Sequence, residues 1–177
     1  MTEEFSEKSD GSVQLKVIFE GDPPPGISLP HVEFIKFNHP WHHVFLRKFG
    51  HLQEAHGVKF ARQSDQSLHA FRDFKFDAIR FSFKIFAVLQ ALSLFRPDQF
   101  FAWIDADVRC IKSFNQFDLF GFFPDEHQIM SYLGRTNFPP TGAYSECGFL
   151  GFNARHPQTI SFLNRMAEIY KIGRAHV

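Results

Sequence analysis

The chain has 177 residues, of which 44% are hydrophobic and 21% charged, and its 19 basic side chains balance its 19 acidic ones. This length and composition indicate one globular domain and exclude a disordered or collagen-like chain. The charge balance argues against a nucleic-acid-binding protein, which usually has a basic excess, and no apolar run reaches the ~18 residues of a membrane-spanning helix.

The cysteine content indicates a reducing compartment. Cys110 and Cys147 are too few for a disulfide scaffold, so reduced thiols are expected. The N-terminus is acidic and polar, unlike a secretory signal. We therefore expect a cytoplasmic protein.

Both ends of the chain differ from the part between them. Residues 1–12 form a polar N-terminal segment, which is either a free tail or the remnant of a helix. Residues 172–177 read IGRAHV and resemble one translated frame of a widely used sequencing adapter; the alternative is that they are native. The predicted domain therefore spans residues 13–171, and we expect it to be truncated at both ends.

The first half of the chain predicts two short strands and a helix. Apolar and polar residues alternate over 13–19, which indicates a strand, and a second extended run covers 32–37. Residues 21–26 contain three consecutive prolines and predict a loop. Asn38 and Pro40 are typical of a helix start, and helical spacing continues to Gly57. Residues 62–67 are polar and predict an exposed loop.

The second half predicts a long helix, strands and a further helix. The strongest helical pattern runs from about 74 to 94 and ends before Pro97, and the apolar run 100–104 predicts a buried strand. Residues 131–133 and 149–152 are weaker strand candidates, and 157–170 predict a helix with one apolar face. The alternation indicates the α/β class, and the 25 phenylalanines predict a phenylalanine-rich core.

Two carboxylates follow directly on the apolar run 100–104, at Asp105 and Asp107. In an extended chain, residues i and i+2 face the same way, so both carboxylates should project together where ligands bind in open α/β sheets. Paired hard oxygen ligands suit Mg²⁺ or Mn²⁺, which in turn neutralise a diphosphate. The alternative is a pair of solvated acids in a turn, because so short a motif also occurs by chance.

A basic pair lies on the long predicted helix. Arg80 and Lys84 are one turn apart, and together they could bind a diphosphate, Arg80 as a forked donor and Lys84 as a point charge. The alternative is that both are exposed helix charges near Asp73 and Asp77.

A third candidate site lies at residues 145–149. Glu146 precedes an apolar strand, and Gly148 permits close approach of the backbone, so Glu146 could bind sugar hydroxyls or act as a base. Asn153 would close the same pocket wall. The alternative is a turn with an exposed glutamate. Cys147 is not predicted to be a nucleophile, because no local signature supplies a histidine partner.

The histidines and glycines exclude other classes of site. His39, His42 and His43 are predicted to be surface or helix-capping residues, because adjacent histidines diverge on a helix and no cluster has zinc spacing. The chain contains neither G-x-x-x-x-G-K-[ST] nor G-x-G-x-x-G, which argues against a P-loop or a dinucleotide-binding enzyme.

Taken in order, these segments resemble the nucleotide-sugar-dependent glycosyltransferases of the GT-A type, and are most similar to a bacterial and viral group of glycosyltransferase-like proteins. The resemblance covers about Val13 to Tyr170 and is carried by Arg80–Lys84, Trp103–Val108, Leu133–Arg135, Ser145–Phe149 and Gly151–Asn153. It implies a GT-A-like, Rossmann-like fold with a mixed, mostly parallel sheet flanked by helices.

The resemblance also implies roles for the candidate residues. Asp107, with Asp105, would hold a divalent metal, usually Mn²⁺ and otherwise Mg²⁺, against the diphosphate of a nucleoside-diphosphate-sugar donor. The implied catalytic residues are Glu146 and Asp105. The implied donor-binding residues are Arg80, Lys84, Asp105, Gly148 and Asn153. The acceptor would be a glycan, a protein or a lipid.

The chain departs from the family pattern at two places, and two other functions stay open. Nothing upstream of Val13 clearly supplies the part that holds the nucleotide base, and the chain stops before the late metal ligand, commonly histidine. One alternative is a non-catalytic nucleotide-sugar or glycan-binding module of the same fold. The other is a Mg²⁺-dependent nucleotidyltransferase or phosphotransferase, which also needs paired carboxylates.

Overall fold

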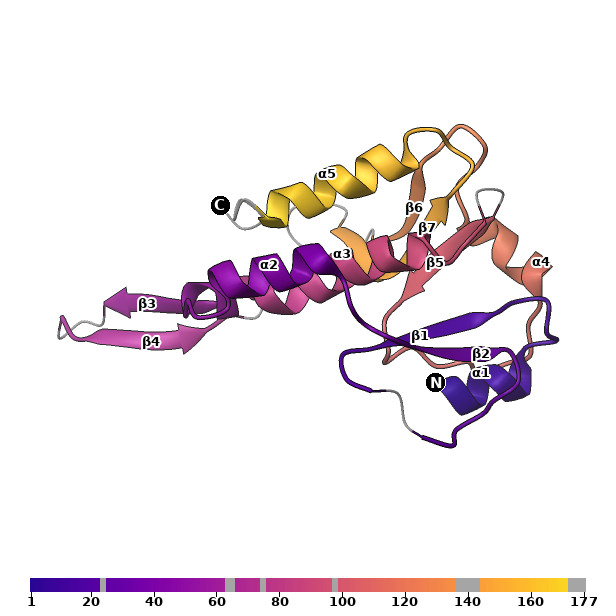
Figure 1. Ribbon diagram of the computed structural model, residues 1–177, viewed down its shortest axis with the longest axis horizontal. Coiled ribbons are helices and arrows are strands. Elements are labelled where there is room, and N and C mark those ends of the chain that lie inside the picture. Colours follow the sequence, from indigo (N-terminus) through magenta and orange to yellow (C-terminus); the bar gives the residue numbers. More distant parts are fainter. Residues whose placement is uncertain (23–24, 63–65, 74–75, 97–98, 136–143, 172–177) are drawn as a thin grey trace. The chain divides into compact units, whose positions relative to one another are not determined.

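The computed structural model describes residues 1–22, 25–62, 66–73, 76–96, 99–135 and 144–171, with the backbone alone at 134–135, 144–147 and 171. These residues form a mixed α/β structure of short sheets and helices, divided into two compact units (Figure 1). The first unit comprises residues 1–37 and 94–160, and the second comprises 38–93 and 161–177. The chain thus leaves the first unit after Phe37 and returns to it at Leu94.

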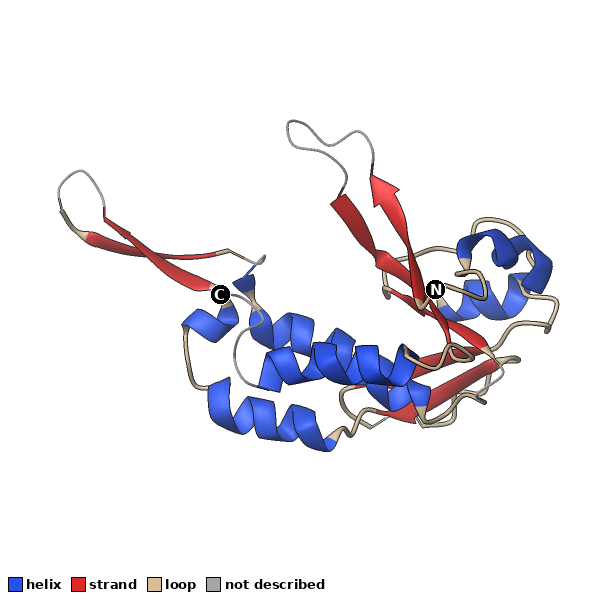
Figure 2. Ribbon diagram, turned by 90° about the horizontal axis from the view of Figure 1, so that it is seen from above, coloured by secondary structure: helices blue, strands red, loops and turns tan. Residues whose placement is uncertain are grey.

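The first unit contains two separate sheets. Strands β1 (Leu15–Phe19) and β2 (Val32–Lys36) pair in parallel. Figure 2 draws all strands in red and the helices in blue. Strands β5 (Phe100–Ile104), β6 (Met130–Arg135) and β7 (Tyr144–Asn153) form an antiparallel sheet in the order β5–β7–β6. The expected mostly parallel sheet is therefore wrong for the described strands. Too few residues separate β6 from β7 for the crossover that a parallel pair needs.

Three short helices complete the first unit. The polar N-terminal segment forms helix α1 (Thr2–Lys8), which buries Phe5 to 5% exposure, so over these residues it is a packed helix and not a free tail. Helix α4 (Gln116–Leu119) begins with a capping box between Asn115 and Asp118, and a 3₁₀ turn, η3 (Phe120–Phe122), follows it.

Phenylalanines make up much of the core of the first unit. The rings of Phe101 and Phe152 stack at 5.0 Å, and their strands β5 and β7 are direct neighbours. The prediction of a phenylalanine-rich core is confirmed for these residues, but Phe117 and Phe120 of this unit are 69% and 56% exposed.

The second unit is mainly helical. It contains α2 (Pro40–Phe49), the 3₁₀ turn η1 (Glu54–His56), α3 (Ala78–Leu92) and most of α5 (Thr159–Lys171). Helix α2 begins at Pro40 as predicted but ends at Phe49, with Gly50 as its C-cap. Gly57, which adopts a positive φ, instead ends the separate turn η1. Asp77 caps α3 by accepting a hydrogen bond from the Arg80 backbone N–H at 2.9 Å.

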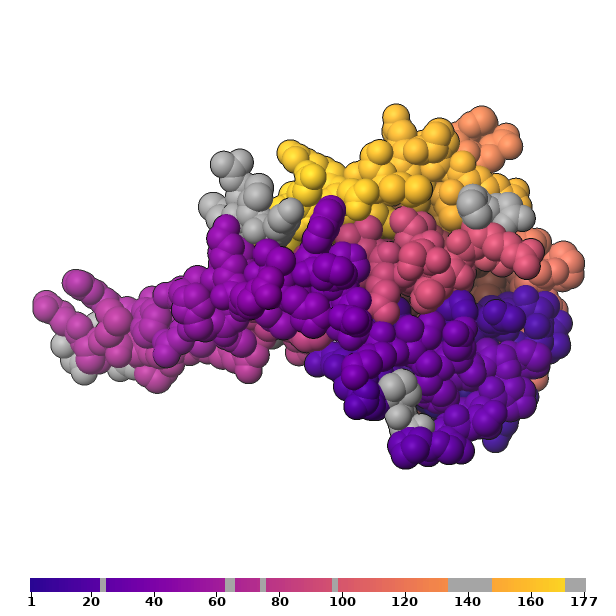
Figure 3. All heavy atoms as spheres, viewed as in Figure 1, coloured from indigo at the N-terminus to yellow at the C-terminus, as the bar shows by residue number. Residues whose placement is uncertain are grey.

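A hairpin in the second unit was not predicted from the sequence. Strands β3 (Val58–Arg62) and β4 (Leu68–Arg72) pair antiparallel, so the expected loop 62–67 includes the last residue of β3 and the connection between the strands. Phe60 and Leu68 are 49% and 64% exposed, and the hairpin side chains lie at the surface (Figure 3). The alternation of apolar residues here is too short to distinguish a strand from a helix end.

The histidine predictions need one correction. His42 is a core residue, 2% exposed, and its Nε2 lies 3.1 Å from the Ser82 Oγ of α3. His39 occupies the N-cap position of α2 but makes no side-chain cap bond, and His43 is exposed beside Asn38. Adjacent residues on a helix lie about 100° apart, so His42 can lie on the face toward α3 while His43 stays exposed.

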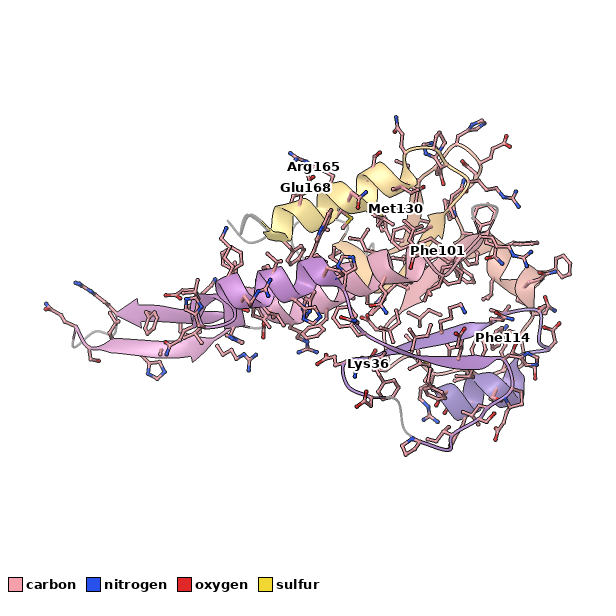
Figure 4. All side chains as sticks on the ribbon, viewed as in Figure 1. Lys36, Phe101, Phe114, Met130, Arg165 and Glu168 are labelled. Atoms are coloured by element: carbon pink, nitrogen blue, oxygen red, sulfur yellow. The ribbon has the colours of Figure 1, made fainter. Side chains whose placement is uncertain are left out.

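Helix α5 closely matches its predicted range of 157–170. Leu163 and Ala167 are 1% and 0% exposed, four residues apart on one face. Arg165 and Glu168 form an ion pair on the solvent side of the same helix (Figure 4). Two residues of the predicted apolar face are therefore buried, whereas Ile160, which was expected on the same face, is 58% exposed.

Candidate functional site

Strand β5 ends at Ile104, and the two candidate carboxylates lie in the turn that follows. The Val108 backbone N–H donates to the Asp105 carbonyl oxygen at 3.1 Å, which closes a turn over residues 105–108, called the acidic turn below. The extended geometry from which we predicted that Asp105 and Asp107 face the same way is therefore wrong, because the i, i+2 rule holds only within a strand.

The i, i+2 rule does hold for Trp103 and Asp105, because the Asp105 backbone still pairs with Gly148 of β7. Trp103 and Asp105 lie two residues apart at the end of β5, and the Trp103 indole Nε1–H donates to Asp105 Oδ1 at 2.6 Å. A hydrogen bond to a charged acceptor is stronger than one between neutral groups, so the indole fixes the direction of this carboxylate. Asp107, two residues further along the turn, is exposed.

A bulge in β7 lies beside the acidic turn. The β6 register passes from Tyr132 opposite Leu150 to Leu133 opposite Glu146, so residues 147–149 lie at the step between these pairs. On the other side of β7, Ile104 pairs with Phe149, and the Asp105 backbone N–H donates to the Gly148 carbonyl oxygen at 2.9 Å. The structure therefore brings Asp105 and Gly148 together, as bulges near functional sites often do.

Glu146 and Cys147 belong to the same stretch of β7. The Glu146 backbone pairs with Leu133, but the side chains of Glu146 and Cys147 lie outside the described residues. The backbone alone places the predicted segment 145–149 beside the end of β5. The direction of the Glu146 carboxylate stays a prediction.

Asn153 lies at the other end of the same strand pair. It pairs with Phe100, four residues from the Ile104–Phe149 pair, or about 13 Å along the strand. Its Nδ2 donates to the Asp125 carbonyl oxygen at 3.2 Å, and its Oδ1 accepts from the Arg155 backbone N–H at 2.9 Å. These contacts tie the end of β7 to its neighbouring loops, and the structure does not place Asn153 at the acidic turn.

Arg80 and Lys84 lie in the second unit, within the first two turns of α3. Arg80 is exposed, and its backbone N–H is held by the Asp77 cap. Asp77 also pairs with Arg72 from β4. Because the acidic turn belongs to the first unit, the predicted meeting of the basic pair with the two carboxylates stays a prediction.

The segment leaving the acidic turn is attached to α1. Arg109 Nε donates to Glu4 Oε1 at 2.9 Å, and the Cys110 backbone N–H donates to Glu4 Oε2 at 3.3 Å. The hydrogen bond from Arg109 lowers the pKa of Glu4 below its ordinary value, while burial raises the pKa of the Cys110 thiol. Cys110 forms no disulfide.

Sequence reasoning missed two residues of this site. Trp103 carries a usable signal, because a residue two positions before Asp105 on a strand has to share its face. Glu4 carries none, because 105 residues separate it from Arg109. Such a contact depends on tertiary structure alone.

The number and type of ligands in the acidic turn decide which kind of metal site it could form. Across the described ranges, no three His, Cys, Asp or Glu side chains gather as a group that could hold a metal. Mg²⁺ and similar hard cations commonly bind proteins through only one or two carboxylates, with phosphate oxygens and waters as the other ligands. The pair Asp105 and Asp107 fits that second kind of site.

Two further findings bear on the class of protein. Among the described helices, none combines the length and apolar character needed to cross a membrane. A comparison of the chain with protein-family models, with curated proteins and with solved structures finds no match in any of the three.

Proposed function

We propose that this protein is a metal-dependent glycosyltransferase that moves a sugar from a nucleoside-diphosphate-sugar donor to an acceptor. The observation that carries the proposal is the hydrogen bond between Asp105 and Gly148, which joins the acidic turn to the bulge of β7. Two segments that were singled out separately in the sequence thus meet at one end of one sheet. The resemblance to GT-A enzymes gives the same two segments their roles.

The donor set of the acidic turn supports a cation bound together with a diphosphate. Asp105 and Asp107 supply two hard oxygen ligands, and a carboxylate accepts at both oxygens, so the Trp103 bond is compatible with metal binding. When bound, Mn²⁺ or Mg²⁺ supplies Lewis-acid stabilisation of the departing nucleoside diphosphate. The residues of the chain itself have to hold this site in place.

Each candidate residue has a defined task in this proposal. Trp103 orients the Asp105 carboxylate, and Gly148, whose carbonyl oxygen accepts from the Asp105 backbone N–H, contacts the donor sugar. Arg80 and Lys84 have the task that the resemblance implies for them, which is to bind the diphosphate. Glu146 binds the donor sugar or serves as the base toward the acceptor.

The acceptor class and the place of action are also part of the proposal. A glycan, a protein or a lipid would each present a hydroxyl or amine to the donor sugar. We place the reaction in the cytoplasm, and the unpaired thiol of Cys110 supports a reducing compartment.

The first test measures binding of nucleoside diphosphates to the protein. Titration calorimetry with UDP, GDP, ADP and CDP, in Mn²⁺ and in chelator, should show affinity that depends on Mn²⁺ for at least one of them. Asp107→Asn should weaken that binding by at least about 10- to 100-fold, the range for losing an outer-shell partner, because it removes a metal ligand itself. Glu126→Gln is the matched control, because Glu126 is exposed and lies in a different loop.

Each outcome of this test decides between the candidate functions. Equal binding in Mn²⁺ and in chelator would overturn the metal site. Mn²⁺-dependent binding together with release of the nucleoside diphosphate from a nucleoside-diphosphate sugar supports the transferase. Binding of nucleotide sugar without any turnover indicates the binding module instead, and consumption of nucleoside triphosphates indicates the nucleotidyltransferase.

A further inference from the structure

Helix α1 holds the segment that leaves the acidic turn at two separate points. At the first, the Glu4 carboxylate accepts hydrogen bonds from the Arg109 side chain and from the Cys110 backbone. At the second, the Phe114 backbone N–H donates to the Lys8 carbonyl oxygen at 3.0 Å, and the Asp10 backbone N–H donates to the Phe114 carbonyl oxygen at 3.3 Å. We call these two attachments the N-terminal clamp.

Apolar packing supports the second attachment. The rings of Phe5 and Phe114 meet edge to face at 5.3 Å, and Phe5 is 5% exposed. Ser9 and Phe114 form an isolated parallel β-bridge at the same place. Figure 4 labels Phe114 beside α1. Phe114 is therefore fixed by both backbone and side chain, so the attachment does not depend on charge.

The first attachment has a different character. The Glu4 side chain is 25% exposed and Arg109 is 75% exposed, so the ion pair alone contributes little to folding. Its place in the chain gives it another use. Arg109 is two residues after Asp107, whereas the start of the acidic turn is held by the Asp105–Gly148 bond. Glu4 therefore fastens the one end of the turn that the sheet does not hold.

We propose that Glu4 is a positioning residue for Asp107, acting through Arg109 and the Cys110 backbone to hold the acidic turn in its metal-binding geometry. This inference rests on the proposed function, because it assigns the N-terminal helix a role in the same site. Binding groups act efficiently when the surrounding structure holds them in place before the ligand arrives. Without Glu4, part of the binding free energy has to order residues 106–109.

The test measures Mn²⁺ binding by the full chain, using the electron paramagnetic resonance signal of free Mn²⁺. Glu4→Ala should raise the dissociation constant for Mn²⁺ by about tenfold, the lower end of the effect of outer-shell partners. Glu3→Ala is the matched control, because it removes the same charge from the same helix turn at an exposed position. It should leave the dissociation constant within twofold of wild type.

A double-mutant cycle separates positioning from a general loss of structure. If Glu4 acts through Arg109, then Glu4→Ala should have a much smaller effect in an Arg109→Gln background than in the wild type. Hydrogen exchange at the Cys110 amide reports the attachment directly and should accelerate in Glu4→Ala but not in Glu3→Ala. Exchange at the Phe114 amide should stay slow in both variants, because its bond to Lys8 is unaffected.

Three results would each contradict a different part of this proposal: the metal site, the positioning role of Glu4, or its action through Arg109. If wild type binds no Mn²⁺ and Asp107→Asn changes nothing, the proposed function fails, and the role of Glu4 fails with it. If wild type binds Mn²⁺ through Asp107 but Glu4→Ala matches Glu3→Ala, only the positioning role is wrong. If the effects of Glu4→Ala and Arg109→Gln add fully, Glu4 does not act through Arg109.

Discussion

His42 of α2 is buried against α3, and this environment disfavours the protonated form of its imidazole ring. Burial, together with the nearby His43 and His39, lowers its pKa from 6.5 to about 4. Its ring contacts Phe83 at 4.3 Å between centroids, so a charged imidazolium would be surrounded largely by aromatic carbon. The native state therefore binds a proton at His42 less readily than the unfolded chain does.

This shift predicts how stability depends on pH. Between pH 6.5 and about 4 the unfolded state binds more protons, so stability falls as the pH falls and this contribution is lost completely below about 4. The full loss is about 3 kcal/mol, since each unit of pKa is worth about 1.4 kcal/mol. Urea unfolding at pH 7 and at pH 4.5 should show a large part of this difference.

The variant His42→Gln should flatten that pH dependence even though it lowers stability at neutral pH. His127→Gln is the control, because His127 is 86% exposed and should leave the slope unchanged. An equally steep slope in His42→Gln would assign the pH dependence to other groups.

At the same scale, the sequence predicted several residues of the candidate site but not the contacts that orient their side chains. Asp105 and Gly148 were both singled out, and the structure places their backbones in contact. The extended geometry expected for residues 105–107 was wrong, because chain direction after a strand depends on a turn that no short pattern specified. Glu4 could not be found, since its partner lies 105 residues away.

At the scale of elements, β7 is the central strand of the three-stranded sheet in the first unit. It pairs with β5 on one side and with β6 on the other, and its glycines permit close approach. A Cβ atom at Gly151 would lie 2.5 Å from Ser131 Oγ and 3.2 Å from the Phe122 carbonyl oxygen. Ser131 Oγ itself donates to that carbonyl, so the space is already occupied.

Gly151→Ala should therefore destabilise the protein by about 1–3 kcal/mol, the range for overpacking a well-filled site. Gly121→Ala is the matched control, because no neighbouring atom lies within 4 Å of a Cβ at that position. Chemical denaturation of both variants checks the prediction. Equal stability of the two would mean that Ser131 moves aside at no cost.

Elements with a long, regular apolar pattern were predicted well, and those defined by pairing were not. Helix α3, strand β5 and helix α5 each appear within a few residues of their expected ranges. The β3–β4 hairpin was missed, and the mostly parallel sheet was wrong. The direction of a neighbouring strand is decided by how the chain returns to it, and periodicity within one segment carries no information on that return.

At the scale of the whole molecule, each of the two units has its own core and its own tryptophan. Trp103 belongs to the first unit, and Trp41 to the second. The second unit buries Phe45, Phe86 and Leu163, whereas the first buries Phe101 and Phe152. Because local stability follows local packing, the two units should open with different free energies.

Single-tryptophan variants test this division. Fluorescence of Trp41→Phe follows the first unit, and fluorescence of Trp103→Phe follows the second. The two urea midpoints should differ, and at pH 4.5 the midpoint reported by Trp41 should fall further, because His42 belongs to the second unit. Coincident curves at both pH values would show that the chain unfolds in one step.

The N-terminal clamp also constrains the order of events during synthesis of the chain. Glu4 leaves the ribosome long before Arg109, its partner in the clamp. The hydrogen bond from Asp105 to Gly148 likewise cannot form until 43 more residues have been made. At about 5–20 residues per second, α1 spends several seconds without the segment it attaches to. Phe5 is exposed for that whole interval, so the newly made N-terminal segment is a natural client for a chaperone until residue 114 has emerged.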